Sequence, residues 1–321
     1  MSVATSDTIN PALGPVTALT AREVLQAVAE IEQERARSQQ VVRQTNGYIT
    51  QRLAAEIGRS VLLGLDSRNN QLAASADQDL LDVFWGNANY SHLGNDKGNP
   101  LAYSTDMYQF VGGVDKTLGD FVVGTSLTYV YSNTQQVIND NNTHTIGVTP
   151  YAAYKFNDYV FATLLAGYNY TNTDNEARGR NSDTHDYLTE FNINGVYAID
   201  SFFMKGRGGV RYKHTYTSIR DSMDADFDEL VWIGDVEFGY QFDENISAYT
   251  GALYEYRDQE SFNLSNVRIG GNEVHDGVVY IRAGVDYQLT SGFFLGVSGT
   301  TEVNDEDHDI YTVGLNFRLD I

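Results

Sequence analysis

Apolar and polar residues alternate along most of residues 81–321, in about twelve stretches of roughly 10–15 residues each. A period of two is typical of β-strands whose two faces meet different surroundings. These strands are long compared with those of soluble sheets, which usually have about 5–6 residues. The expected strands lie near residues 82–91, 104–118, 121–133, 144–156, 159–171, 185–199, 202–216, 229–242, 246–257, 277–290, 293–302 and 309–321.

The connections between these strands alternate in length. The short connections carry turn residues and are Gly119-Asp120, Asn157-Asp158, Asp200-Ser201, Asp243-Glu244-Asn245 and Ser291-Gly292. The long connections are polar and acidic and lie at 92–103, 134–143, 172–184, 217–228, 258–276 and 303–308. An even number of long strands, with short turns at one rim and long loops at the other, is typical of a transmembrane β-barrel.

Charged residues in the clearest strands keep to one of the two faces. In strand 202–216 the cations have odd numbers, whereas Val210 and Tyr212 have even ones. Strands 185–199, 229–242 and 277–290 also place their charges opposite their large apolar residues. The candidates for facing a lumen and docking a helix are Lys205, Arg207, Arg211, Lys213, Asp235, Glu237, Asp186, Glu190, Arg282 and Asp286.

Alternation alone does not separate a soluble sandwich from a membrane barrel, but the aromatic residues do. Those that flank the short turns are Phe121, Phe156, Tyr159, Phe202, Phe203, Phe242, Phe293 and Phe294. Those toward the long loops are Tyr129, Tyr131, Tyr168, Tyr170, Tyr216, Tyr254 and Tyr256. Aromatic belts at both strand ends are expected at two membrane–water interfaces. The pattern therefore predicts a transmembrane barrel rather than a soluble β protein.

Residues 1–80 have a different character. Tyr48 is their single aromatic residue, and nine acids against seven bases give them a net charge of −2 out of −22. The spacing of Thr20 and Glu23 matches a helix capping box. We expect a break or kink at Asn46-Gly47, because Asn and Gly disfavour helix interiors.

The fold class that follows is an all-β transmembrane barrel of about twelve antiparallel strands with an N-terminal α-helix. The expected division is a disordered N-terminus at 1–17, a helical segment at 18–64 with a pore helix at about 48–64, a linker at 65–80 and the barrel at 81–321. In the pore helix, Arg52, Glu56 and Arg59 offer charges of both signs to the lumen.

Composition excludes several classes of function. A net charge of −22 argues against nucleic-acid binding, which needs Lys and Arg to neutralise phosphates. The absence of cysteine excludes disulfides, thiolate zinc sites and cysteine catalysis. No GxSxG motif occurs and no histidine lies mid-strand beside a plausible serine, so we do not expect an enzyme. We assign no catalytic residue, cofactor or metal.

Three stretches carry a family resemblance. They are YQFVGGVDKTLGDFVVGTSLTYVYSNT (108–134), GVTPYAAYKFNDYVFATLLAGYNYTNT (147–173) and the closing IYTVGLNFRL (310–319). With them, residues 81–321 resemble the translocator domain of monomeric autotransporters, the barrel of type V secretion. TQRLAAEIG (50–58) is similar to the helical segment that those proteins thread through the pore.

The resemblance implies a barrel in a Gram-negative outer membrane that exports an N-terminal passenger and keeps its own helix in the lumen. The implied partners are outer-membrane lipids, the barrel-assembly machinery, periplasmic chaperones and a passenger in cis, with the barrel a monomer. The alternative is a stand-alone porin-like channel or a surface-loop adhesin without a passenger.

The chain departs from the family pattern in three respects. No signal peptide is visible in MSVATSDTINPALG, no sizeable passenger precedes the helix, and the last residue is Ile321 rather than an aromatic one. We expect an excised translocator or a chain with a mis-set start, and a natural passenger-less protein stays open. Asn69-Asn70, which matches a self-cleavage site in some autotransporters, is interpreted as ordinary linker.

Two groups of residues, the cations of strand 202–216 and the histidines, have more than one interpretation. The basic ladder of strand 202–216 satisfies neighbouring carboxylates, docks the helix or selects solutes. The six histidines lie in or beside the long loops, where metal capture or a pH response competes with simple solvated side chains. They are His92, His144, His185, His214, His275 and His308.

Overall fold

A computed structural model gives the fold of the chain. It describes residues 21–58, 82–95, 102–136, 140–175, 180–220, 223–243, 245–259, 263–264, 267–268, 274–290, 292–303 and 308–321. The elements are α1 (Ala21–Ile57), β1 (Val83–Asn95), β2 (Tyr103–Leu118), β3 (Phe121–Gln136), β4 (Asn141–Lys155), β5 (Val160–Asn175), β6 (Arg180–Ile199), β7 (Phe202–Arg220), β8 (Met223–Gln241), β9 (Ile246–Gln259), β10 (Asn263–Leu264), β11 (Val267–Arg268), β12 (Val274–Thr290), β13 (Phe293–Glu302) and β14 (His308–Asp320).

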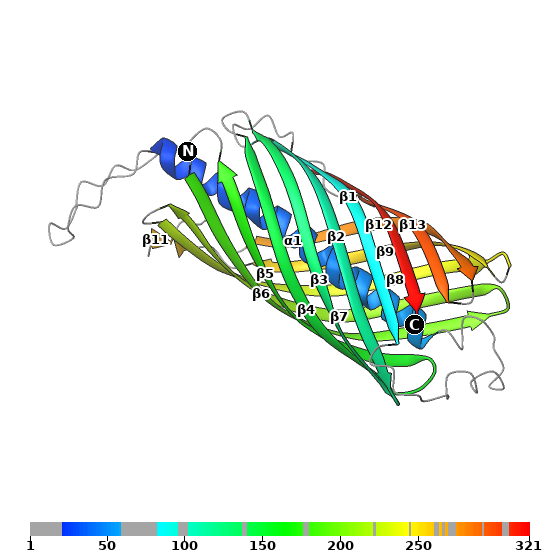
Figure 1. The fold of residues 1–321 in the computed structure, drawn as a ribbon. Helices are drawn as coiled ribbons and strands as arrows, with labels where there is room; N and C mark the ends of the chain where they lie inside the picture. The colour runs from blue at the N-terminus through cyan, green and yellow to red at the C-terminus, as the bar shows by residue number, and fades with distance from the viewer. Residues whose placement is uncertain are drawn as a thin grey trace.

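The twelve long strands close into one antiparallel barrel (Figure 1). Each pairs with the next along the chain, β9 pairs with β12, and β1 pairs with β14 to complete the ring. The two-residue strands β10 and β11 lie between β9 and β12 in sequence and attach to the edge of β8 through Asp226 and Ala225. The predicted twelve-strand barrel is therefore confirmed.

Several strands extend further toward the long loops than the alternation predicts. β6 begins at Arg180 rather than near 185, and β8 begins at Met223 rather than near 229. These extensions carry polar residues and are therefore not recognised from the apolar alternation. They are still strands because backbone pairing continues past the apolar band, as it does between β7 and β8. At the opposite rim, two-residue turns hold Gly119 at φ 64° and Asp200 at φ 52°.

The barrel is inside out compared with a soluble protein. The buried side of β4 carries Thr143, Thr145 and Thr149, whereas its exposed side carries Ile146 and Val148. The same inversion holds around the ring, where large apolar side chains face outward and hydroxyl, amide and charged side chains face inward. An apolar exterior around a polar interior is the arrangement that a lipid environment selects.

Helix α1 runs through the barrel without interruption (Figure 1). The break expected at Asn46-Gly47 is wrong, because the helix continues through both residues to Ile57. Asn46 is fully buried, and its side-chain amide donates a hydrogen bond to Glu190 at 2.9 Å. Tertiary contacts thus outweigh the weak helix propensity of Asn and Gly.

An apolar core lies between one side of the helix and one part of the barrel wall. Ile49, Leu53 and Ile57 recur every four residues, so they share one face of α1. They pack with side chains of β1 to β6, among which Trp85 and Phe161 are fully buried. Burial of this stripe fixes which side of the helix meets these strands.

Some expected segments lie outside the described residues. These are the N-terminus at 1–17, positions 59–64 of the expected pore helix and the linker at 65–80. The described helix α1 lacks the long, strongly hydrophobic stretch that a membrane-spanning helix requires.

Candidate functional site

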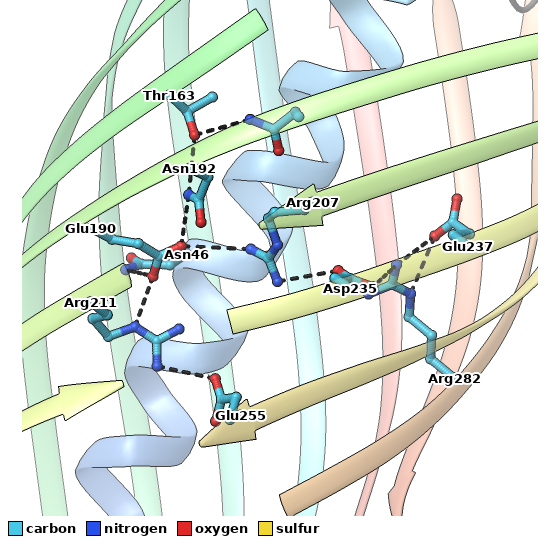
Figure 2. A network of polar contacts seen from close by, with 11 residues as sticks. Asn46, Thr163, Glu190, Asn192, Arg207, Arg211, Asp235, Glu237, Glu255 and Arg282 are labelled. Carbon is cyan, nitrogen blue, oxygen red and sulfur yellow. Dashed lines mark hydrogen bonds and ion pairs between the residues drawn. The ribbon is translucent and has the colours of Figure 1, made fainter. Parts of the chain in front are cut away.

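The basic ladder of β7 faces the lumen that holds α1 and is paired with acids on both neighbouring strands (Figure 2). The register places Arg207 opposite Asp235 of β8, and Arg211 opposite Glu190 of β6. Arg211 Nε stands 2.7 Å from Glu190, and Arg207 Nη2 stands 3.2 Å from Asp235. At the ends of the ladder, Lys205 pairs with Glu237 at 2.8 Å and Lys213 pairs with Glu229 at 3.1 Å.

Arg282 joins the same network from β12, although β9 separates β12 from β8. Its guanidinium stands 2.9 Å from Asp235 and 3.0 Å from Glu237. Gly251 of β9 lies in register with both Glu237 and Arg282. A Cβ on Gly251 would stand 3.3 Å from the Arg282 Nε, so the missing side chain leaves the passage through which Arg282 reaches its acids.

The helix meets this wall through neutral polar side chains. Ser38 donates to Asp186 at 2.8 Å and accepts from Lys213 at 3.1 Å. Gln39 donates to Glu229 at 2.9 Å, and Asn46 donates to Glu190, as described above. Of the predicted lumen residues, Asp186, Glu190 and Lys213 therefore contact the helix directly, as does Glu229, which the sequence interpretation did not include. The ion pairs of Arg207, Arg211 and Arg282 are with other strands.

Asp286 stands apart from the ion-pair network. It is half buried on β12, opposite Gly296 of β13 and Ser247 of β9. Its carboxylate occupies the space that a Cβ on Gly296 would take. Asp286 thus shares the inner side of β12 with Arg282 without joining the Arg282 ion pairs.

A second cluster holds the C-terminal part of the helix. Arg52 forms a buried ion pair with Asp115 of β2, with one guanidinium nitrogen 2.9 Å from a carboxylate oxygen. The same carboxylate accepts hydrogen bonds from Trp85 at 3.2 Å and Tyr151 at 2.9 Å. Tyr48 packs against Trp85, with ring centroids 5.3 Å apart.

The sequence interpretation included Arg52 but missed its partners. Asp115, Trp85 and Tyr151 come from three different strands, and the available signal was the odd number of Asp115, which it shares with the buried Gln109 of the same strand. Glu56 pairs with Arg318 of β14. Arg59 lies outside the described residues.

The histidines whose side chains are described lie near the long-loop ends of the strands. His92 and His214 stand 3.0 and 2.8 Å from Asp106 and Asp228. His144 and His185 instead meet the hydroxyls of Tyr129 and Tyr168, at 3.0 and 2.8 Å. The side chains of His275 and His308 are outside the description. Among the described residues, no three His, Asp or Glu side chains gather as a metal site needs.

Autotransporter domains are among the solved structures with the same architecture. The β-domain of Bordetella BrkA superposes with a TM-score of 0.60 at 13% identity, over 75% of this chain and 100% of that one. The translocator domain of NalP from Neisseria meningitidis gives 0.60 at 10%, over 82% and 99%. The transport unit of AIDA-I from Escherichia coli gives 0.55 at 12%, over 84% and 97%. These likenesses show a shared fold.

Sequence comparison extends the likeness from fold to family. No curated protein sequence matches this chain. The family model described as the autotransporter β-domain, however, matches residues 84–300, which cover more than half of the chain and reach from β1 into β13. A twelve-strand barrel with a helix in its lumen and this sequence match lead to one conclusion: the chain belongs to the autotransporter β-domain family.

Proposed function

We propose that this chain is an outer-membrane translocator of a Gram-negative cell, which anchors in the membrane and exports an N-terminal passenger to the cell surface. The observation that carries the proposal is a helix threaded through a closed barrel of the autotransporter β-domain family (Figure 1). A chain segment that has passed outward through a pore leaves its C-terminal end inside that pore. Helix α1 is in that position.

The direction of the chain supports outward export. With an even number of strands, the barrel begins and ends at the same rim, where the Ile321 N–H donates to the Asp82 carbonyl at 3.0 Å. The helix ends at this rim as well, because Gly58 lies beside Val196, close to the short turn Asp200-Ser201. Short turns face the periplasm in such barrels and long loops face outside. The N-terminal end of α1 therefore lies toward the cell surface.

The helix is suited to plug the pore once export is complete. Eight strands already enclose an interior that side chains fill, so twelve strands leave room for a helix about 10–12 Å across. One side of α1 is sealed by the apolar core around Trp85. The charged wall beyond it bonds to Ser38, Gln39 and Asn46. Apolar and polar contacts together hold the helix along its length.

The closed ring supports a monomer, because β1 and β14 of one chain complete it without a second copy. Its insertion would use the barrel-assembly machinery and periplasmic chaperones, and its apolar exterior would contact outer-membrane lipids. The family is one of transport barrels, and the proposal assigns no catalysis to this chain.

Surface exposure of the N-terminus tests the export proposal. The full chain would carry a cleavable signal peptide followed by an epitope ahead of Met1, and a second epitope after Ile321. Protease added to intact cells should remove the first epitope and spare the second, since the two ends lie on opposite sides of the membrane. Protection of both epitopes, in cells whose barrel shows heat-modifiable gel mobility, would contradict export.

A further inference from the structure

Helix α1 does not fill the lumen evenly. Its apolar stripe lies against the wall formed by β1 to β6, and on another side of the helix a cavity of about 90 Å³ separates α1 from the wall that includes β9 and β12 to β14. By the same measure, a single water needs about 10–15 Å³. The cavity therefore has room for a polyatomic ion of five heavy atoms.

The cavity wall is basic. Among its described lining residues are three arginines, Arg43 of the helix, Arg207 of β7 and Arg282 of β12, and no carboxylate. The remaining lining is amide, hydroxyl, aromatic and aliphatic, apart from Gly47. The charged side chains that line this space are therefore all cations, although Arg207 and Arg282 are also ion-paired with acids of the wall.

Arg43 lines the cavity from the side of the helix. It is 7% exposed, yet it forms no ion pair with any described carboxylate. Its guanidinium lies 3.5 Å from the centroid of the Tyr280 ring and donates a hydrogen bond to Gln40. Buried charges in proteins are normally paired with an opposite charge. Arg43 instead contacts an aromatic ring and a neutral amide, and the carboxylate that acts on it from a distance, Glu255, already pairs with Arg211 and Arg257.

Arg207 supplies further unused donors. It is 9% exposed, and one side of its guanidinium pairs with Asp235 at 3.2 Å. Its Nε and Nη1 donate no hydrogen bond to the described residues, and the Nη1 contact with Glu190 is 3.6 Å, beyond hydrogen-bond length. Buried donors are nearly always satisfied in folded proteins. The planar array of guanidinium donors matches the oxygens of phosphate and related oxyanions.

We propose that this cavity binds a small inorganic oxyanion, of sulfate or phosphate size, between Arg43 on the helix and Arg207 on the wall. The ion would give Arg43 a close opposite charge, which Glu255 supplies only from a distance, and it would accept from the Nε–H of Arg207, which has no hydrogen-bond partner among the described residues. Because one arginine belongs to α1 and the other to the barrel, the ion would also fasten the helix to the wall. The site is independent of the export proposal, because binding is measured without transport.

Equilibrium dialysis of the full chain in detergent with radiolabelled sulfate tests the site. Wild-type protein with heat-modifiable mobility should bind sulfate saturably, with about one ion per chain, and inorganic phosphate should displace it. A Cβ on Gly47 would meet no atom within 4 Å. Gly47→Leu should therefore fill the cavity and weaken binding at least tenfold without removing any charge, whereas Gly47→Ala should retain it.

Arg43→Gln provides the second variant and should also weaken sulfate binding at least tenfold. It decides the question if Gly47→Leu fails to fold. Absence of saturable sulfate binding to the wild type would overturn the proposal. Equal affinity of the folded Gly47→Leu protein would do the same, since the sulfate would then be bound elsewhere.

Discussion

Single buried side chains decide where the helix is held. The carboxylate of Asp115 receives the guanidinium of Arg52, the indole N–H of Trp85 and the hydroxyl of Tyr151. All four side chains are buried. Such a pair adds little over an apolar equivalent when intact, but loss of one partner leaves a buried charge without compensation. Asp115 is therefore a sensitive position for testing the contact between helix and barrel.

Asp115→Ala should lower the free energy of unfolding by about 3–5 kcal/mol, because Arg52 would stay buried without its acid. Urea titration of the full chain in lipid vesicles measures this change. Asp158→Ala is the control, since Lys155–Asp158 is also a pair of a cation and a carboxylate but is largely exposed to solvent. Its removal should cost less than about 1 kcal/mol. Equal losses in the two variants would show that the Arg52–Asp115 contact is not special.

Gly251 tests the reach of Arg282 across β9. In Gly251→Ala the added Cβ would stand 2.6 Å from the Val236 carbonyl oxygen and 3.3 Å from the Arg282 Nε. We expect the free energy of unfolding to fall by about 1–3 kcal/mol, which is typical of overpacking. The change is measured as a lower urea midpoint. Gly234→Ala on β8, where a Cβ would meet nothing within 4 Å, should leave the midpoint almost unchanged. An unchanged urea midpoint in Gly251→Ala would mean that Arg282 does not need the space that Gly251 leaves.

At the scale of the element, α1 differs from an isolated helix because both of its sides are specified by the wall. Ile49, Leu53 and Ile57 face the apolar core, and Ser38 and Asn46 bond to acids of β6. The two sets together set the rotation and height of the helix. At 1.5 Å per residue, its 37 residues reach about 55 Å, more than the apolar band of about 25 Å. The helix therefore spans the lumen from rim to rim.

Removal of the helix should open the pore. In planar bilayers, a chain that starts near Gln78 should conduct several-fold more than the full chain, because a helix about 10–12 Å across would no longer obstruct a twelve-strand lumen. Both proteins must first show heat-modifiable mobility, so that only folded barrels are compared. Equal single-channel conductances would mean that α1 does not block the pore.

At the scale of the whole molecule, the two tryptophans report the inverted arrangement. Trp232 is 55% exposed on the outside of β8, whereas Trp85 is 0% exposed inside the barrel. If the outer surface meets lipid, acyl chains contact Trp232 and never reach Trp85. The pair thus separates a membrane barrel from a soluble one by a measurement on the native fold.

Brominated acyl chains should quench the two residues very differently. In vesicles, the Trp85→Phe protein, which keeps Trp232, should lose most of its fluorescence when ordinary lipid is replaced by brominated lipid. The Trp232→Phe protein, which keeps Trp85, should change little. Similar quenching of both proteins would refute the lipid-facing assignment of the exterior.

The sequence alone determined the twelve strands and the sharing of one face by the charges of β7. The physical reason is that successive side chains of a strand point to opposite sides, so the parity of Lys205, Arg207, Arg211 and Lys213 expresses a shared face without any tertiary information. The turn residues further indicated which rim carries the short connections, and the aromatic belts indicated that the barrel lies in a membrane. The same local rules misjudged Asn46-Gly47, since propensity contains no term for contacts with distant strands.

Only the tertiary structure decided which groups meet across the lumen. Arg52 finds Asp115, Arg282 passes Gly251 to reach Glu237, and Arg43 is left facing a cavity. These contacts depend on the register of strands far apart in sequence and on the rotation of α1. Both are set by the closure of the ring and by burial of the apolar stripe against β1 to β6. No local pattern of residues encodes such distances, because they arise only when all twelve strands and the helix are in place.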